Sequence, residues 1–105
     1  MRLEHYPIDA LRDGIVAILS RYLDLRNYRI FFFGSRVAGN GSERSDIDVG
    51  IEGDTSIPFH VMRRIRDDIE TLSTLYTIEI VDFQRVSQDF RDVALQHVEP
   101  LVHSA

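Results

Sequence analysis

Residues 30–51 read IFFFGSRVAGNGSERSDIDVGI, and this stretch decides the fold. It opens on the apolar run 30–33, which is typical of a buried strand. A glycine and a serine end that run, and a loop rich in polar and small residues, Gly34–Ser45, follows. Over Asp46–Glu52, apolar and other residues alternate, which predicts a second strand with one polar face. A loop this long between two strands of a small chain is more often functional than not.

Helical patterns flank this stretch on both sides. Before it, apolar residues recur at helical spacing over 11–22, and Pro7 is placed to begin that helix. The first strand is predicted over Tyr28–Phe33. After the second strand, a helix is predicted to begin at Pro58 and to bury one side, formed by Phe59, Met62, Ile65, Ile69 and Leu72.

The remaining residues are predicted to add one strand and one helix. Tyr76–Phe83 has a strand pattern, and Ser87 is a suitable N-cap for a helix over Gln88–His97. Pro100 is expected to end this helix and to leave residues 101–105 frayed or docked on a partner. The order α-β-loop-β-α-β-α predicts an α/β (α+β) fold, a small mixed sheet flanked by helices, in a single domain over residues 1–105.

Composition excludes several classes of function. The 105 residues carry a formal net charge of -5, which argues against broad nucleic-acid binding. The chain has no cysteine, so a metal must bind to oxygen or imidazole ligands. No apolar run approaches the roughly 18 residues of a membrane span, and no signal peptide is evident. A cytoplasmic location is therefore expected, without membrane association.

Known phosphate-binding and calcium-binding motifs do not account for the loop. A P-loop requires a lysine where Asn40 stands, and the chain contains no lysine. The loop lacks the glycine pattern of a dinucleotide-binding turn. An EF-hand is excluded because the residues after Asp46 alternate as a strand and Gly50 occupies a ligand position.

Strand geometry indicates a metal site. In a strand, residues i and i+2 share a face about 6.6 Å apart, so Asp46 and Asp48 are predicted to point the same way. Two carboxylates this close repel each other unless a cation lies between them, and Mg²⁺ prefers such oxygen ligands. Two metal ions about 3.5–4 Å apart can stabilise both the attacking and the leaving oxygen of a phosphoryl displacement.

A two-metal site needs more acids, and Glu79 is the natural third. It lies in the middle of the third predicted strand, between Ile78 and Ile80. Asp82 follows three residues later and is predicted to lie on the opposite face, as a structural or exposed acid. Gly34 lets the main chain approach a triphosphate closely, and Ser35 offers a hydroxyl and a backbone N–H to its terminal phosphates.

Together these residues resemble the signature of the minimal nucleotidyltransferases, members of the DNA polymerase beta-like nucleotidyltransferase superfamily. Gly34-Ser35, ten residues and then Asp46-x-Asp48 match its first two elements, and Glu79 between two isoleucines matches the third. The third acid is glutamate where aspartate is common. The resemblance implies ATP and Mg²⁺, with an acceptor oxygen attacking the α-phosphate. Asp46 and Asp48 would then hold the metals, and Glu79 would complete the set and help to activate the acceptor.

The resemblance also implies a protein acceptor. Minimal nucleotidyltransferases resemble the antitoxin half of a pair in which the partner is a HEPN-domain ribonuclease, silenced by AMP added to a tyrosine. The sequence contains no second domain for binding an acceptor. Two alternatives stay open. The chain could transfer the nucleotide to a small molecule or a nucleic-acid end, or it could be a catalytically weak module that acts by binding alone. Self-association also stays open.

Overall fold

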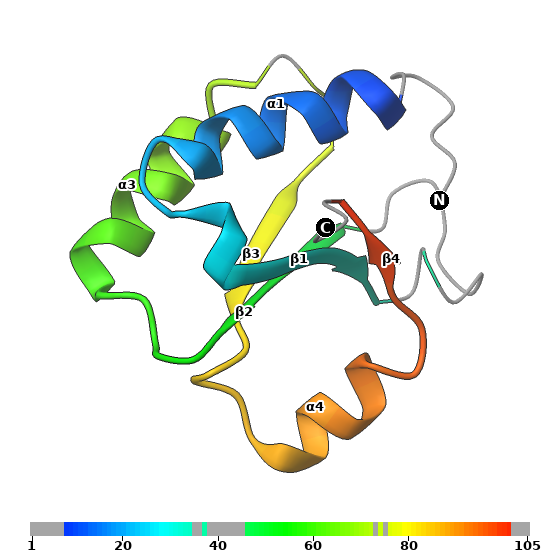
Figure 1. The fold of residues 1–105 in the computed structure, drawn as a ribbon. Helices are drawn as coiled ribbons and strands as arrows, with labels where there is room; N and C mark the ends of the chain where they lie inside the picture. The colour runs from blue at the N-terminus through cyan, green and yellow to red at the C-terminus, as the bar shows by residue number, and fades with distance from the viewer. Residues whose placement is uncertain (1–7, 35–36, 38–45, 73, 75, 102–105) are drawn as a thin grey trace.

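A computed structural model describes residues 8–34, 37, 46–72, 74 and 76–101. Figure 1 shows these residues as a twisted sheet with helices on both sides. The elements, in chain order, are α1 (Ile8–Ser20), the 3₁₀ turn η1 (Leu25–Asn27), β1 (Tyr28–Phe33), β2 (Ile47–Gly53), α3 (Phe59–Ile69), β3 (Ile78–Asp82), α4 (Gln88–Ala94) and β4 (Glu99–Pro100).

The four strands form one sheet in the order β3-β2-β1-β4. β1 pairs antiparallel with both β2 and β4, whereas β2 and β3 run parallel. The register places Asp48 opposite Phe33 on one side and opposite Glu79 on the other. The predicted mixed sheet is therefore confirmed, and the register aligns the end of β1 with both acidic strands.

The two faces of the sheet have different coverings. α1 and α3 lie over one face and α4 lies over the other (Figure 1). β2 shows the division most clearly, because its odd-numbered residues Ile47, Val49 and Ile51 are fully buried in the core under α1 and α3. Its even-numbered residues point to the α4 face, as the period of two requires.

The core under α1 and α3 follows the predicted helical patterns except near the helix ends. Tyr22 and Leu72 are only partly buried and lie beyond the ends of α1 and α3. Leu11, Ile15 and Ile18 of α1 are buried, and so are Met62, Ile65 and Ile69 of α3. Phe59, however, is 72% exposed, so its predicted burial is wrong. It is the first residue of α3, and its ring stacks against the Arg85 guanidinium, 3.8 Å from the ring centroid, instead of entering the core.

Aromatic side chains fill the α4 face. Phe31, Phe33 and Phe83 are buried there, and the ring of Phe90, from α4, lies about 6 Å from two of them, Phe33 at 6.0 Å and Phe83 at 5.8 Å. These four residues are called the aromatic cluster below. Their edge-to-face arrangement is the favoured geometry for aromatic pairs. Gly50 leaves the space for them, because a Cβ there would lie 2.5 Å from the Phe31 ring.

The C-terminal part corrects two expectations. Ser87 does cap α4, accepting a hydrogen bond from Phe90 N, but the helix ends at Ala94 instead of His97. A turn over residues 95–98 leads to β4 at Glu99–Pro100. Leu101 is 6% exposed, and its N–H donates to Ile30 O at 2.9 Å. A frayed residue 101 was therefore a wrong prediction, since its apolar side chain joins the core. Residues 102–105 lie outside the described part of the chain.

Strand ends also differ slightly from the pattern. β2 begins at Ile47, so Asp46 precedes the strand instead of opening it. β3 covers only Ile78–Asp82 of the predicted Tyr76–Phe83. Among the described residues, no helix is both long and apolar enough to cross a membrane.

Candidate functional site

The structure places Asp48 and Glu79 side by side on the α4 face, and Asp46 lies just before the start of β2. Asp48 on β2 is in register with Glu79 on the neighbouring β3, so both side chains leave the sheet on the same face. Asp46 precedes β2 by one residue and is exposed. The predicted proximity of these acids follows directly from the pairing of β2 and β3.

The pKa of the Asp48 carboxyl shows how these acids affect one another. Burial raises this pKa above its usual range, and the negative charges of Asp46 and then Glu79 raise it further. Phe33, its partner on β1, is almost fully buried beside it. Asp48 is thus a half-buried carboxylate surrounded by like charge, a position that favours a cation.

Gly34 is in direct contact with Asp48. Its φ of +89° is in the region that favours glycine, and a Cβ placed on it would overlap Asp48 Oδ2 and lie 3.2 Å from Cγ. The turn after β1 therefore runs against the central acid with no room for a side chain. Ser35, predicted to bind phosphate, lies outside the described residues.

Two residues that support the site were missed by the sequence reasoning. Val37 is half-buried and packs against the core under α1 and α3. Its signal was an isolated apolar residue in a polar segment. Gly50 lies two residues beyond Asp48 on the same face and admits the aromatic cluster. Its signal was a glycine inside an alternating strand, which often marks close packing.

Asp82 has a structural role, as predicted. It is 5% exposed and accepts hydrogen bonds from Ile57 N at 2.7 Å and Gln84 N at 2.9 Å. Arg85 forms an ion pair with it at 3.5 Å. Its partner in the register is the buried Ile51, which places it on the face opposite Glu79. It joins the β2–α3 connection to the end of β3 and takes no part in the acidic group.

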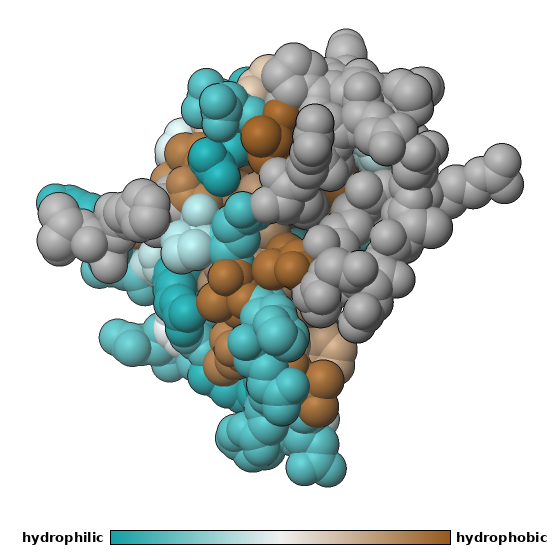
Figure 2. Space-filling view, turned by 90° about the vertical axis from the view of Figure 1, so that its right-hand side faces the viewer, coloured by the Kyte–Doolittle hydropathy of each residue, from teal (hydrophilic) through white to brown (hydrophobic). Residues whose placement is uncertain are grey.

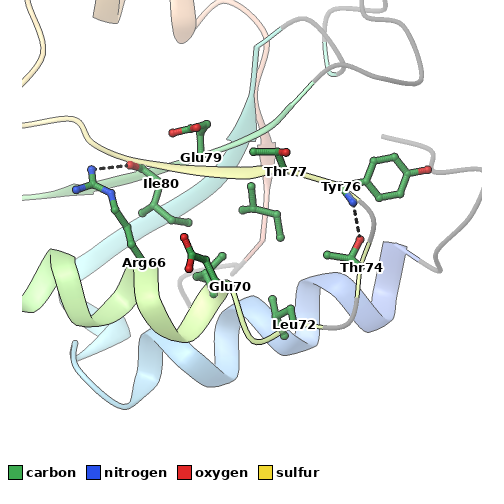
Figure 3. A pocket seen from close by; sticks show the side chains of 10 residues that line it. Arg66, Glu70, Leu72, Thr74, Tyr76, Thr77, Glu79 and Ile80 are labelled. Atoms are coloured by element: carbon green, nitrogen blue, oxygen red, sulfur yellow. Dashed lines mark hydrogen bonds between the residues drawn. The ribbon is translucent and has the colours of Figure 1, made fainter.

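A cavity of about 400 Å³ adjoins the outer edge of β3. Figure 3 shows Arg66 and Glu70 reaching from α3 toward β3, with Arg66 hydrogen-bonded to Ile80 O at 3.2 Å. Glu79 lies on the other side of the strand in the same view. The cavity therefore reaches the acidic strand from the face opposite the carboxylate.

Asp48 and Glu79 share a face of the sheet, but the carboxylates do not converge on a common metal position. Among the residues that the structure describes, no three His, Cys, Asp or Glu side chains are placed to hold a metal ion jointly. Their oxygens nevertheless form the hard donor set that Mg²⁺ prefers. A glycine turn against one of three clustered carboxylates can accommodate a polyphosphate whose negative charge is balanced by metal ions.

Comparisons by sequence and by structure found similar proteins. "Probable protein adenylyltransferase MntA" of Haemophilus influenzae is 27% identical over 67 residues, which is 64% of this chain and 59% of that protein. The matched segment thus spans less than two thirds of that relative.

Two solved structures share the fold. One is tri-AMPylated Shewanella oneidensis HEPN toxin in complex with MNT antitoxin, with a TM-score of 0.66, 14% identity, and coverage of 89% of this chain and 70% of that chain. The other is assigned as a minimal nucleotidyltransferase, with a TM-score of 0.68, 21% identity, and coverage of 92% and 98%.

A family model also matches most of the chain. The model described as polymerase beta, nucleotidyltransferase, matches residues 14–104, which include Gly34 and all three acids. The predicted relation to the polymerase beta-like superfamily is therefore confirmed. This chain belongs to the polymerase beta nucleotidyltransferase family.

Proposed function

We propose that this chain is a Mg²⁺-dependent nucleotidyltransferase that transfers AMP from ATP to a hydroxyl group of a partner protein. The observation that carries the proposal is a row of three residues across neighbouring strands. Gly34 directly follows β1, Asp48 lies on β2 and Glu79 lies on β3. Membership of the family favours nucleotidyl transfer. The relative named as a protein adenylyltransferase favours AMP as the group transferred and a protein as the acceptor.

The partner that we propose is a HEPN-domain toxin, which the chain would neutralise as its antitoxin in the cytoplasm. Support comes from the Shewanella complex, in which an AMPylated HEPN toxin is bound to an MNT antitoxin. The net charge of -5 agrees with a protein acceptor better than with a nucleic-acid end, which needs a basic surface.

Asp46, Asp48 and Glu79 are the residues that would hold Mg²⁺, as a two-ion site. Their fit rests on the raised pKa of the Asp48 carboxyl, because a cation beside it would relieve the repulsion from its two neighbours. No arginine within the described ranges forms an ion pair with any of the three. When bound, Mg²⁺ neutralises phosphate charge and stabilises the charge that develops during transfer.

The residues of this row have different roles, because one end would bind the phosphates and the other would activate the acceptor. The lack of a side chain on Gly34 lets the main chain pass directly against Asp48, and Ser35 would add a hydroxyl and a backbone N–H for the phosphates. Glu79 is separated from Gly34 by β2, so it is placed to orient the acceptor hydroxyl and to receive its proton. The acceptor oxygen then bonds to the α-phosphorus as the bond to the bridging oxygen breaks, and pyrophosphate leaves.

The test measures transfer of AMP from α-labelled ATP with Mg²⁺ to a HEPN-domain protein that forms a complex with this chain when the two are co-expressed. Asp48→Asn is expected to lower the rate by at least about a hundredfold. The matched control is Asp54→Asn, an exposed aspartate just beyond the other end of β2, which is expected to keep the rate. Equal labelling by wild type and Asp48→Asn would contradict the proposal. Neutralisation without any labelling would identify a binding module instead.

A further inference from the structure

The outer edge of β3 carries main-chain groups that face away from the rest of the sheet. Within the described residues, β3 pairs only with β2. Ile47 N donates to Thr77 O, and Phe83 N donates to Ile51 O, so the odd-numbered positions face β2. In a parallel ladder the even-numbered positions then face outward, which places the main-chain groups of Ile78 and Ile80 on the edge.

Arg66 limits the length of this edge. Its Nη2 donates to Ile80 O at 3.2 Å, which confirms that this carbonyl points outward. Beyond it, the Ile78 N–H and C=O and the Ile80 N–H remain as three outward-facing groups directly beside Glu79. Ile78 is half-buried and Ile80 is 2% exposed. Unpaired edge groups of this kind can pair with another extended chain that reaches them.

The cavity and the Glu79 carboxylate lie on the two faces of this same edge strand. Arg66 of α3 and Glu70, which caps this helix, border the cavity together with Glu79, whose side chain points to the other side of β3 (Figure 3). An extended polypeptide has the same two-sided character, because its successive side chains point to opposite faces. A strand added to β3 would therefore place one side chain beside Glu79 and the next one in the cavity.

We propose that the acceptor protein docks by adding an extended segment to the outer edge of β3. The acceptor side chain, a Ser, Thr or Tyr hydroxyl, lies beside Glu79, and a neighbouring side chain enters the cavity. Main-chain hydrogen bonds at Ile78 and Ile80 set the register, in the recognition mode known as strand addition. This inference rests on the proposed transfer to a protein hydroxyl and names how that protein is held.

The cavity also indicates the chemistry of the neighbouring side chain. Its apolar wall is formed by Ile69, Leu72, Ile78 and Ile80. Its polar end holds Arg66, which has no carboxylate partner among the described residues and donates only to Ile80 O. A side chain with an apolar stem and an oxygen acceptor at its tip matches this lining, because Arg66 has further donors to offer.

The decisive experiment measures amide hydrogen exchange by NMR in the Asp48→Asn chain, alone and in complex with the HEPN-domain protein, without nucleotide. The Ile78 and Ile80 amides are expected to exchange at least about tenfold more slowly in the complex. The Phe83 amide, already bonded to Ile51 O, is the internal control and is expected to change less.

The outcomes separate this inference from the proposed function. A stable complex with unchanged Ile78 and Ile80 exchange overturns edge docking, while labelling by wild type keeps the transfer. Slowed exchange without labelling by wild type contradicts the transfer and keeps the docking edge. Failure to form any complex overturns the docking inference.

A kinetic comparison tests the cavity. Arg66→Ala is expected to raise KM for the HEPN-domain protein about tenfold, with kcat and ATP affinity unchanged, because it removes one charge-assisted contact. Arg64→Ala is the matched control on the same helix, since Arg64 is exposed and does not line the cavity. An unchanged KM in Arg66→Ala, or a weaker ATP affinity, would contradict the assignment of the cavity to the acceptor.

Discussion

Gly34 and Asp48 are in contact across the β1–β2 pair, with no space between them for a methyl group. A Cβ on Gly34 would overlap Asp48 Oδ2, and the φ of Gly34 is +89°. The glycine of the loop and the central acid therefore form one unit, although they are separated by thirteen residues of sequence.

Gly34→Ala is expected to damage both activity and stability. The alanine would occupy a strained backbone conformation and displace the Asp48 carboxylate, which costs about 1–3 kcal/mol of unfolding free energy. Urea denaturation and the AMP-transfer rate check the result. Gly14→Ala is the control, because a Cβ there meets only the flexible end of Leu72 and alanine favours the helix. Equal unfolding free energies of Gly34→Ala and Gly14→Ala would contradict the predicted backbone strain at position 34.

Asp48→Asn is expected to stabilise the fold at neutral pH while it removes activity. The pKa of Asp48 is raised in the folded chain, so ionisation of this carboxyl opposes folding. The penalty is present above the folded-state pKa and is gone below the unfolded value of about 3.9. The gain in unfolding free energy should therefore shrink as pH falls to that value. Thermal unfolding across pH in a chelator measures it, and a gain that grows on acidification would contradict the prediction.

Gly50→Ala is expected to destabilise the fold by about 1–3 kcal/mol through overpacking. The added methyl would lie 2.5 Å from the Phe31 ring and 2.7 Å from the Phe83 ring. Urea denaturation measures the loss. The double variant with Phe31→Leu should recover part of it, because the smaller side chain yields space. A strictly additive loss in the double variant would show that the ring contact is not the cause.

Asp82→Asn is expected to lower stability by about 1–3 kcal/mol without changing the transfer rate per folded molecule. Both of its oxygens accept backbone N–H donors, and an amide NH₂ group in place of one oxygen would face a donor. Thermal unfolding and active-site-normalised kinetics separate the two effects. A rate loss at full folding would assign Asp82 to the chemistry instead.

The period of two in the sequence was sufficient to predict β2 and the face on which Asp48 lies. Asp48 and its alternating neighbours contain all the information needed to assign both faces of β2. The pairing of Asp48 with Glu79, however, depends on parallel strand register, which local pattern does not encode. The resemblance in the spacing of Gly34-Ser35 and the acids supplied that link.

Two expectations failed because tertiary packing outweighed local pattern. Phe59 has the spacing of a core residue, but Arg85 stacks on its ring at the start of α3. Leu101 follows a proline in a short tail, yet its side chain enters the core and its N–H pairs with β1. A two-residue edge strand such as β4 is too short to produce a periodic signal.

The alternation along β2 has a consequence for how relatives can diverge. Buried isoleucines and valine maintain the fold on one face, while Asp48, Gly50 and Glu52 occupy the other. A single-residue insertion or deletion in this strand would exchange the two sets at once. We therefore expect evolutionary length changes to be absent from β2 and to collect in the connections between elements, so that substitution is the route by which this strand changes.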